Sequence, residues 1–554
     1  MTEEKFYNLV QRRKSFPYDE GIRDQLRPYK VDNAIIMAAG MSSRFVPLSL
    51  ETPKGLLKVH GEVLIERQIR QLQDAGINDI TVVVGYKKEM FFYLEEQFKV
   101  KIVVNPDYYR YNNTSTLMLV LSLLRNTYIC SSDNYFVDNV FEEYVYQSYY
   151  AAVFAEGKTN EYCLQYDAEG KIIGVDIGGR DAWYMLGHVY FDKNFSDKFR
   201  QILLHDYEQI SEVRNYLWED VYISHIDELS LYIRKYDAGK VKEFDSLDEL
   251  RSFDEDYLSN LNSAIMDNIV SVLQCTKNDI KEIYPIKSGM TNISFYFSCL
   301  GKKYVYRHPG EGTEKYINRS SEAFAMTQAN RLGLDNTFIY MDAEEGWKIS
   351  HYIENARTLD YHNNDDVKKA MKLVRSLHEA KIQSECEGDI WLAANAFIEK
   401  MPHVSKIKGV QELHDFIKRI YYYAKLDNAE KVLCHYDCYD PNFLLDRQGK
   451  MYLIDWEYAC VDDPAIDLGT FICCADYSYS EALKVIEVYL ARKPENEELR
   501  HFIAYIAIAS YYWYLWALYQ EANDNHVGDY LYIWYKYSWE YGKTAMEMYE
   551  GMID

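Results

Sequence analysis

A run of small residues followed by two basic residues is the first part of the sequence that could do chemistry. The apolar stretch from Val31 to Met37, interrupted by Asp32 and Asn33, predicts a buried parallel strand. The residues that follow it are Ala38, Ala39, Gly40, Met41 and Ser42. A loop of such small side chains lets backbone N–H groups approach a polyphosphate, and Arg44 and Lys54 add positive charge. The glycine spacing is neither that of a Walker loop nor that of a Rossmann fingerprint. We therefore predict that this loop binds a nucleotide.

Asp133 stands at the carboxyl end of a second apolar strand, which runs from Tyr128 to Ser132. A carboxylate at that place can hold Mg²⁺ against a phosphate, because this hard cation prefers oxygen ligands. A second carboxylate has to come from elsewhere, and Glu219 and Asp220 are the best candidates. An isolated Asp at this position is more typical of a loop cap, so the metal-site prediction depends on the nucleotide loop beside it.

A second pattern, His-Tyr-Asp-Cys-Tyr-Asp-Pro-Asn, occupies residues 435–442. Asp437 and Asn442 have the spacing of the kinase catalytic loop, and Asp455 stands where kinases carry a Mg²⁺-binding Asp. One carboxylate can accept a hydroxyl proton, while the amide and the other carboxylate can hold a metal ion. The protein-kinase markers D-F-G and A-P-E are absent from the sequence, which indicates a small-molecule substrate.

The elements that must position these residues are of two kinds. Between 31 and about 250, apolar strands at 80–85, 101–105 and 128–132 alternate with amphipathic segments such as 88–98, which predicts an α/β domain with a parallel sheet. Residues 1–30 are predicted to be an irregular extension packed on this domain, and 251–279 to be a junction. From 280 onward, a strand–turn–strand centred on 288–292 and a strand at 303–307 precede a mainly helical remainder, interrupted by a hairpin near 432–455. This order predicts a small β lobe followed by a larger helical lobe, as in kinases.

The composition narrows the possible partners and the compartment. A formal net charge of −25 disfavours binding to nucleic acid or to an anionic membrane. Phe502 to Tyr519 has no charged residue and is long enough to raise the question of a membrane span, but its tyrosines and polar flanks favour a buried helix. The scattered cysteines and the charged N-terminal residues, which lack an apolar signal-peptide core, predict a cytoplasmic protein. The oligomeric state is not predicted.

The nucleotide loop resembles the signature loop of the sugar-phosphate and choline-phosphate nucleotidyltransferases. Five further segments occur in the order seen in bacterial CTP:phosphocholine cytidylyltransferases, namely Val84–Tyr86, Tyr111–Ser115, Asp133–Tyr135, Thr159–Glu161 and Trp218–Glu219. The resemblance covers about residues 31–250 and implies a Rossmann-like fold with a mixed, mostly parallel sheet. It also implies that the triphosphate of CTP is held by the loop with Arg44 and Lys54, that the cytosine lies near Gly85, Tyr86 and Ser115, and that Mg²⁺ is bound by Asp133 with Glu219 or Asp220.

Two departures from that family pattern concern the substrate and the metal. Tyr162 follows Glu161 where the family commonly has Trp, and Glu219 replaces an Asp. A tyrosine still offers an aromatic face to a quaternary ammonium group, although a weaker one. Phosphoethanolamine and 2-aminoethylphosphonate therefore stay open as alternatives to phosphocholine, and either Glu219 or Asp220 could bind the metal.

The second pattern resembles the choline kinases of the bacterial surface-phosphocholine type and, more broadly, the aminoglycoside phosphotransferases. The resemblance covers about residues 280–554 and implies a two-lobed kinase-like α+β domain. It implies that Ser288 to Asn292 cover the phosphates of ATP, that Arg307 replaces the usual lysine with Glu322 as its partner, and that Ile353 belongs to the adenine hinge.

Choline requires aromatic walls, because a quaternary ammonium has no N–H to donate. Trp513 and Trp516 lie three apart on one predicted helix face and match the paired tryptophans of choline kinases, with Tyr458 as a third candidate wall. An aromatic stripe of this kind is also typical of core packing, and that alternative stays open.

Taken together, the two resemblances imply consecutive steps: choline is phosphorylated with ATP, and phosphocholine then reacts with CTP to give CDP-choline and pyrophosphate, with Mg²⁺ in both sites. We expect a bifunctional enzyme with domains at 31–250 and 280–554. The nearest alternative uses ethanolamine or 2-aminoethylphosphonate. An alternative of another class makes one domain a catalytically inactive nucleotide- or choline-sensing module. The choice of CTP over UTP is not predicted from the residues.

Overall fold

The computed structural model describes residues 1–237, 239–244, 246–286, 292–310, 317–401, 404, 407–523 and 526–551. Contacts divide the chain into two units, of which one contains 1–285 with 297–300 and the other contains 286–296 with 301–554.

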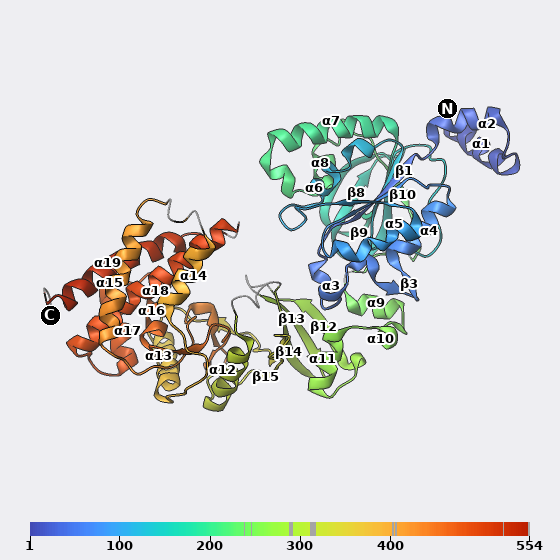
Figure 1. Ribbon diagram of the computed structural model, residues 1–554. Coiled ribbons are helices and arrows are strands. Elements are labelled where there is room, and N and C mark those ends of the chain that lie inside the picture. Colours follow the sequence, from blue (N-terminus) through green and yellow to red (C-terminus); the bar gives the residue numbers. More distant parts are fainter. Residues whose placement is uncertain are drawn as a thin grey trace. The chain divides into compact units, whose positions relative to one another are not determined.

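A seven-stranded mixed sheet forms the centre of the first unit (Figure 1). Its strands, in spatial order, are β10 (Tyr232–Lys235), β8 (Tyr149–Tyr166), β9 (Ile172–Phe191), β6 (Thr127–Ser131), β1 (Asn33–Ala38), β4 (Ile80–Val84) and β5 (Lys101–Val104). The β6–β1–β4–β5 part is parallel, whereas β9 runs antiparallel to both β6 and β8. The sequence prediction of a mixed, mostly parallel Rossmann-like sheet is confirmed.

Alternating residues of the central strands enter two different hydrophobic cores. Ala34 and Ile36 of β1 pack with α4 (Leu64–Asp74) and α5 (Tyr93–Phe98). Ile35 packs with α6 (Asn113–Met118), α7 (Lys193–Gln209) and α8 (Trp218–Ser224). Because neighbouring side chains of a strand point to opposite faces, this division shows that helices cover both faces of the sheet.

Several short helices and two pairs of short strands complete this unit. They are α3 (Leu48–Glu51), the pair β2 (Lys58–Val59) and β3 (Glu62–Val63), the pair β7 (Tyr135–Phe136) and β11 (Val241–Lys242), and the helices α9 (Leu247–Phe253), α10 (Tyr257–Asn260) and α11 (Ala264–Leu273). The predicted helix at 88–98 begins as a 3₁₀ turn, Lys88–Phe91, before α5. The segment 251–279, predicted to be a junction, contains the end of α9 and the helices α10 and α11. It is tied to the sheet domain by hydrogen bonds such as Ile265 N–H to Glu51 Oε1 (3.0 Å).

The prediction that residues 1–30 are irregular is wrong. They form α1 (Glu3–Ser15) and α2 (Glu20–Leu26), whose N-termini are capped by Thr2 and Asp19. Phe6 and Leu9, three positions apart, and Ile22 and Leu26, four apart, place their side chains in one small core that also contains Tyr144. This helical spacing was present in the sequence but was obscured by the many charged residues around it.

From residue 280 onward the chain has the small β lobe and large helical lobe of a kinase-like fold. A five-stranded sheet has the order β12 (Ile280–Pro285), β13 (Asn292–Cys299), β14 (Lys302–Pro309), β16 (Lys348–His351) and β15 (Phe338–Met341), and α12 (Arg319–Leu332) lies between β14 and β15 in the chain. The turn predicted around Ser288 lies outside the described residues except for Asn292. Short strands follow, namely β17 (Arg357–Thr358), β18 (Val432–Cys434), β19 (Phe443–Leu445), β20 (Met451–Leu453) and β21 (Cys460–Asp462). The antiparallel β19–β20 pair is the hairpin predicted near 432–455.

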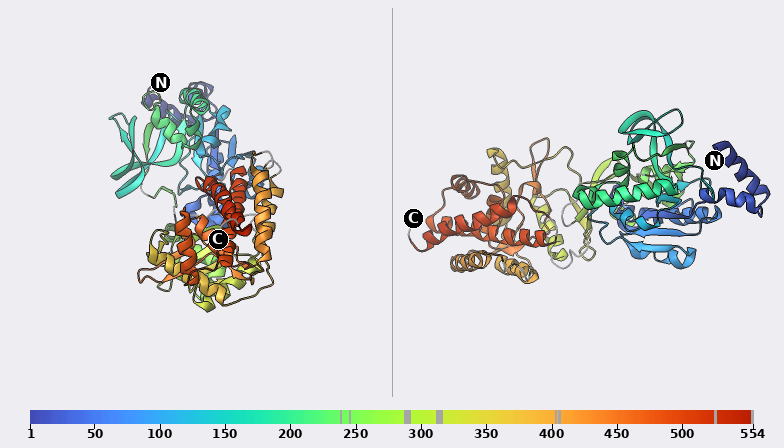
Figure 2. Two further views of the ribbon diagram at one scale, coloured as in Figure 1. Left: turned by 90° about the vertical axis from the view of Figure 1, so that its left-hand side faces the viewer. Right: turned by 90° about the horizontal axis from the view of Figure 1, so that it is seen from above.

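The helical lobe contains α13 (Asn364–Glu379), α14 (Ile390–Lys400), α15 (Val410–Leu426), α16 (Ala465–Cys473), α17 (Tyr479–Leu490), α18 (Asn496–Ala522) and α19 (Tyr530–Tyr549) (Figures 1 and 2). Helices α14, α15, α16 and α19 pack against α18, and α13 packs against α17. Among the described residues, α18 is the one helix long and apolar enough to cross a membrane, and 89% of its most apolar window is buried inside the protein. Its burial agrees with the predicted core helix.

Candidate active sites

The small-residue loop and Asp133 line one cavity of about 360 Å³ in the first unit. The loop contributes Ala38 to Ser43, and the opposite wall comes from Ser131 to Asp133 and from Asn112 and Asn113. Lys54 lies at the same cavity, is 8% exposed, and makes an ion pair of 2.7 Å between its Nζ and Asp133 Oδ2. The loop, the lysine and the carboxylate predicted from sequence are thus in one place.

Gly85 and Tyr86 support the loop from behind. The Tyr86 N–H donates to Ala39 O at 3.1 Å, and a Cβ on Gly85 would lie 2.7 Å from that same oxygen and 2.6 Å from Tyr108 Cβ. Only glycine allows this approach. Tyr108 lines the cavity, whereas Arg44, Gly85, Tyr86 and Ser115, although described, are not among its lining residues. The Ser115 hydroxyl donates to Asn112 O at 2.8 Å.

Glu219 does not line the cavity but is hydrogen-bonded to Asn113, which does. Asn113, which lines the cavity, donates from Nδ2 to Glu219 Oε2 (3.4 Å) and accepts from the Trp218 N–H (2.8 Å). The Tyr150 hydroxyl donates to Glu219 Oε1 at 3.0 Å. Burial raises the pKa of Glu219 to about 7, and its hydrogen bonds only partly oppose that rise. A buried carboxylate with this pKa favours a nearby cation.

Asp220 has a different environment from its neighbour. Its Oδ2 accepts from the Leu217 N–H at 2.9 Å at the start of α8, and its Oδ1 accepts from the Tyr162 hydroxyl at 2.9 Å. Tyr162 is half-buried on β8, and Glu161 beside it is exposed.

The sequence did not single out Glu243, which the structure places near this group. Strand β11 runs antiparallel to β7 with Lys242 opposite Tyr135, so Glu243 leaves β11 at the end where Asp133 enters β7. Glu243 and Glu219 both contribute to the raised pKa of Tyr150, which burial raises most. The pairing of two two-residue strands carries no sequence signal that could have found this.

Asp437 and Asn442 lie together in the second unit. Asn442 Nδ2 donates to the backbone oxygen of Asp437 (2.8 Å) and to its Oδ2 (3.0 Å), which leaves the amide oxygen as a ligand atom. Burial raises the pKa of Asp437 above its usual range, and Asp455 raises it further.

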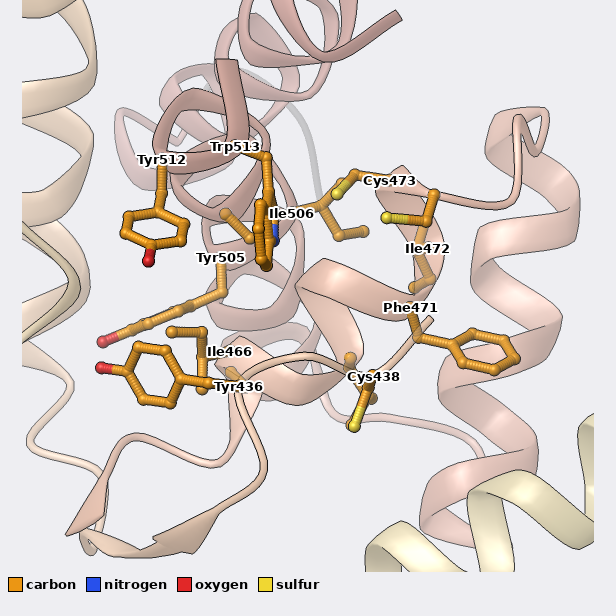
Figure 3. Close-up of a cluster of buried hydrophobic side chains, with 14 of the residues drawn as sticks. Tyr436, Cys438, Ile466, Phe471, Ile472, Cys473, Tyr505, Ile506, Tyr512 and Trp513 are labelled. Atoms are coloured by element: carbon orange, nitrogen blue, oxygen red, sulfur yellow. The ribbon is translucent and has the colours of Figure 1, made fainter. Parts of the chain in front are cut away.

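Asp467, which the sequence analysis missed, fixes the backbone of this segment. Its carboxylate accepts from the N–H groups of His435 (2.8 Å) and Tyr436 (2.7 Å) and from His378 Nε2 (3.0 Å). Figure 3 shows side chains of α16 and α18 gathered around the chain that carries Tyr436 and Cys438. His378, Cys434 and Asp467 are also the one group of three potential metal-ligating side chains found among the described residues, and the hydrogen bonds of Asp467 to this backbone and to His378 indicate a structural role.

A buried network of charges joins Asp455 to the small lobe. Arg307 Nη2 lies 2.6 Å from Glu322 Oε1, and Arg307 Nη1 lies 3.2 Å from Asp455 Oδ1. Lys348, not predicted from sequence, reaches the same two oxygens at 3.5 Å each. Burial alone would raise the pKa of Asp455, but Lys348 and Arg307 outweigh it and lower the pKa. The predicted partnership of Arg307 and Glu322 is present.

Asn292, the one described residue of the turn predicted to cover the phosphates, belongs to this network. Its Nδ2 donates to Glu457 Oε2 at 2.8 Å, and Arg319 makes an ion pair of 2.9 Å with Glu322. Burial raises the pKa of Glu457 to about 7. Ser288 lies outside the described residues. Ile353 follows β16 in a segment whose preceding residue, Tyr352, donates its N–H to Lys303 O at 2.9 Å.

The predicted aromatic walls form one cluster. The Trp513 ring lies 5.5 Å from Trp516 and 6.5 Å from Tyr458, in edge-to-face arrangements. Trp534 of α19, which the sequence analysis missed, lies 5.9 Å from Trp513 and 6.3 Å from Trp516. The neighbouring Tyr512 has its pKa raised chiefly by burial and also by Asp437, so this cluster lies within electrostatic range of the Asp437 carboxylate.

The comparisons with known proteins divide at the same place as the two sites. The profile of the MobA-like NTP transferase domain matches residues 34–166, and that of the Choline/ethanolamine kinase family matches residues 283–510. Choline-phosphate cytidylyltransferase of Streptococcus pneumoniae is 34% identical over 222 residues, which are 40% of this chain and 96% of that protein. 2-Aminoethylphosphonate cytidylyltransferase of Lancefieldella rimae is 37% identical over 235 residues, which are 42% of this chain and 95% of that protein.

A solved structure of choline kinase LicA from Streptococcus pneumoniae is 23% identical, covers 50% of this chain and 98% of its own, and has a TM-score of 0.44. The chain therefore belongs, in its first part, to the nucleotidyltransferase family that includes these cytidylyltransferases, and it carries a choline/ethanolamine kinase domain in its second part.

Proposed function

We propose that this enzyme converts choline to CDP-choline in two steps. The kinase domain phosphorylates choline with ATP, and the cytidylyltransferase domain joins the resulting phosphocholine to the cytidylyl group of CTP with release of pyrophosphate. The observation that carries the proposal is that one chain holds both a kinase site beside an aromatic cluster and a cytidylyltransferase site. The product expected of the first is the substrate expected of the second. The surface glycans of the cell would be the destination of the phosphocholine group.

In the kinase site, we assign proton acceptance from the choline hydroxyl to Asp437, whose environment makes its carboxylate a stronger proton acceptor than an exposed aspartate. Arg307 is the candidate contact for the ATP phosphates, because its Nε atom is buried without a hydrogen-bond partner among the described residues. A phosphate oxygen would satisfy this donor. Tyr458, Trp513 and Trp516 would form walls for the trimethylammonium group.

In the cytidylyltransferase site, a phosphate oxygen of phosphocholine would attack the α-phosphorus of CTP in line with the departing pyrophosphate. The attacking group is already an anion near neutral pH, so no general base is required. Lys54 and the backbone of the Gly40 loop would bind the triphosphate and stabilise the charge of the transition state, with Arg44 beside the loop. Tyr162 and Glu161 are the candidate contacts of the headgroup.

The donors of both sites fit Mg²⁺, which would neutralise phosphate charge. Asn442 Oδ1 and Asp455 supply oxygen ligands in the kinase site. In the other site Asp133 fits, with Glu219 or Glu243 as the second carboxylate, because burial raises the pKa of Glu219 and a bound cation would stabilise its charged form. Asp220 fits least, since both of its oxygens accept hydrogen bonds within the protein.

A second candidate substrate for the first domain is 2-aminoethylphosphonate. Two observations favour it: the 2-aminoethylphosphonate cytidylyltransferase of Lancefieldella rimae is 37% identical, and Tyr162 stands where the family usually has Trp. Ethanolamine remains the corresponding alternative for the kinase. We also propose a cytoplasmic location, because all ten cysteines are free thiols.

Matched variants test whether the two sites act separately. Asp133→Asn should abolish formation of CDP-choline from added phosphocholine but leave phosphorylation of choline unchanged. Asp437→Asn should have the opposite effect. Loss of both activities in either folded variant, or CDP-choline synthesis by Asp133→Asn at the wild-type rate, would contradict the assignment.

A further inference from the structure

Tyr162 is held in place by its hydroxyl as well as by packing. The ring is half-buried on β8, where Tyr162 lies opposite Ile177 of β9, and its hydroxyl donates to Asp220 Oδ1 at 2.9 Å. A phenol ring without such an anchor could rotate about its Cα–Cβ bond, and an aromatic face contributes to cation binding only in the right orientation.

Asp220 is itself fixed before it holds the tyrosine. Its Oδ2 accepts the Leu217 N–H at 2.9 Å, which closes the first turn of α8. One oxygen therefore belongs to the helix and the other to Tyr162, so that neither is directed solely to a ligand. The adjacent Glu219 instead reaches the cavity wall through Asn113.

The charges around the ring suit a cationic headgroup. Burial and the hydrogen bond to Asp220 raise the pKa of Tyr162 to about 12, so the hydroxyl keeps its proton and stays a donor at neutral pH. Glu219 acts on the same ring electrostatically. Two carboxylates next to one aromatic side chain lower the potential where a positive group would bind.

We propose that Asp220 is a positioning residue, which orients Tyr162 for recognition of the substrate's ammonium headgroup and does not bind the metal ion. This inference rests on the proposed function, since it requires the headgroup to lie at Tyr162. It assigns different roles to Glu219 and Asp220, which the sequence alone did not distinguish.

The test is a double-mutant cycle of Tyr162→Phe and Asp220→Asn in the full chain. Tyr162→Phe keeps the ring and the helix cap but removes the hydroxyl donor. Each variant should raise the KM for phosphocholine about five- to tenfold, the effect of losing one hydrogen bond of ordinary strength. The KM for CTP, the kcat and the Mg²⁺ concentration for half-maximal rate should stay within about twofold of wild type. The double variant should resemble Asp220→Asn, because both single changes remove the same hydrogen bond and Asp220→Asn also removes the charge of the carboxylate.

Asp227→Asn, in the exposed turn after α8, is the matched control and should change none of these constants. A Mg²⁺ concentration for half-maximal rate that Asp220→Asn shifts by more than about twofold would overturn the inference, and so would multiplicative effects of the two single changes on KM. If Asp220→Asn fails to fold, an unchanged phosphocholine KM in Tyr162→Phe overturns it equally.

An assay of the wild type with three substrates distinguishes a failure of the proposed function from a failure of this inference. The wild type is first assayed with CTP and phosphocholine, phosphoethanolamine or 2-aminoethylphosphonate. Turnover of either aminoethyl compound but not of phosphocholine would contradict the choline assignment, and the cycle would then be run with the accepted substrate. Turnover of none of them would contradict both proposals.

Discussion

Arg307 and Lys348 lie directly opposite each other on the antiparallel strands β14 and β16, and both reach Glu322 Oε1 and Asp455 Oδ1. Two cations thus share the buried carboxylate of Glu322 and the partly exposed carboxylate of Asp455, the candidate metal ligand. In this arrangement one cation can remain with the carboxylates while the other contacts a phosphate. The register of two strands, rather than a sequence motif, brings the pair together.

Replacement of Lys348 by methionine should impair the kinase alone. The side chain keeps its length but loses its charge, so Asp455 retains only Arg307 as an ion-pair partner among the described residues, while Glu322 retains Arg307 and Arg319. Arg307 is then held more tightly away from the phosphates. We expect kcat/KM for ATP to fall about 10- to 100-fold with the KM for choline nearly unchanged. Lys303→Met, which removes an exposed lysine of β14 paired with Glu354, is the control. Wild-type kinetics in Lys348→Met would contradict this role.

The aromatic cluster should determine the affinity for choline. Trp516→Leu removes a ring 5.5 Å from Trp513 and 6.3 Å from Trp534, so the KM for choline should rise about tenfold while the KM for ATP stays constant. Trp539→Leu removes a tryptophan that stacks on Phe416 elsewhere on α19 and should leave the choline KM unchanged. Equal effects of the two substitutions would indicate that the cluster is only core packing.

Gly85→Ala should weaken nucleotide binding from behind the loop. The added Cβ would lie 2.7 Å from Ala39 O and 2.6 Å from Tyr108 Cβ, so the loop or Tyr108 must move, at a cost of about 1–3 kcal/mol in the free energy of unfolding. The KM for CTP should rise and the Tm of this domain should fall. At Gly40 a Cβ meets no atom within 4 Å, so Gly40→Ala should leave the Tm unchanged. An unaltered Tm in Gly85→Ala would show that the contact relaxes freely.

His188 should make the first domain sensitive to acid. Burial, with a contribution from Arg234, lowers the pKa of its imidazole to about 3, and the ring is held by the Tyr149 hydroxyl (3.2 Å) and lies 3.7 Å from Cys130 Sγ. The unfolded chain binds the proton near its ordinary pKa of about 6.5, whereas the folded protein does so only near pH 3. Stability is therefore full above about pH 6.5 and falls by up to about 1.4 kcal/mol per unit as the pH decreases toward 3.

The measurement for His188 is the urea midpoint of the cytidylyltransferase domain at pH 5 and pH 7. His188→Gln removes the titrating group, so the midpoint should change less between the two pH values than in wild type, whatever its absolute level. His205→Gln, at an exposed position of α7, should keep the wild-type difference. If His188→Gln keeps the full wild-type difference in urea midpoint between pH 5 and pH 7, the acid sensitivity belongs to other groups.

Prediction from the sequence succeeded where residues that act together lie close in the chain. The Gly40 loop, the Asp437–Asn442 segment and the two tryptophans of α18 are each contained within a few residues, and local periodicity marks the strands beside them. The structure also brings Lys54 to Asp133, which the shared nucleotide chemistry led us to expect.

The features that the sequence did not reveal depend on long-range packing. Lys348 meets Arg307 through strand register, Asp467 reaches the His435 and Tyr436 amides from another helix, and Trp534 completes the aromatic cluster from α19. Their residue types are common in helices and strands, so no local pattern distinguishes them. The helices α1 and α2 differ from these cases, because their signal is local. Their apolar faces are small and the residues around them are charged, so the composition of the segment hides the helical spacing.

The most direct test of the two-step reaction is one incubation of the purified chain with choline, ATP, CTP and Mg²⁺, analysed by mass spectrometry, with ethanolamine in a parallel incubation. We predict CDP-choline only when both nucleotides are present, phosphocholine alone when CTP is omitted, and no product from choline when ATP is omitted. Phosphocholine that never becomes CDP-choline would contradict the assignment of the first domain, and the absence of any product from choline would contradict the two-step function.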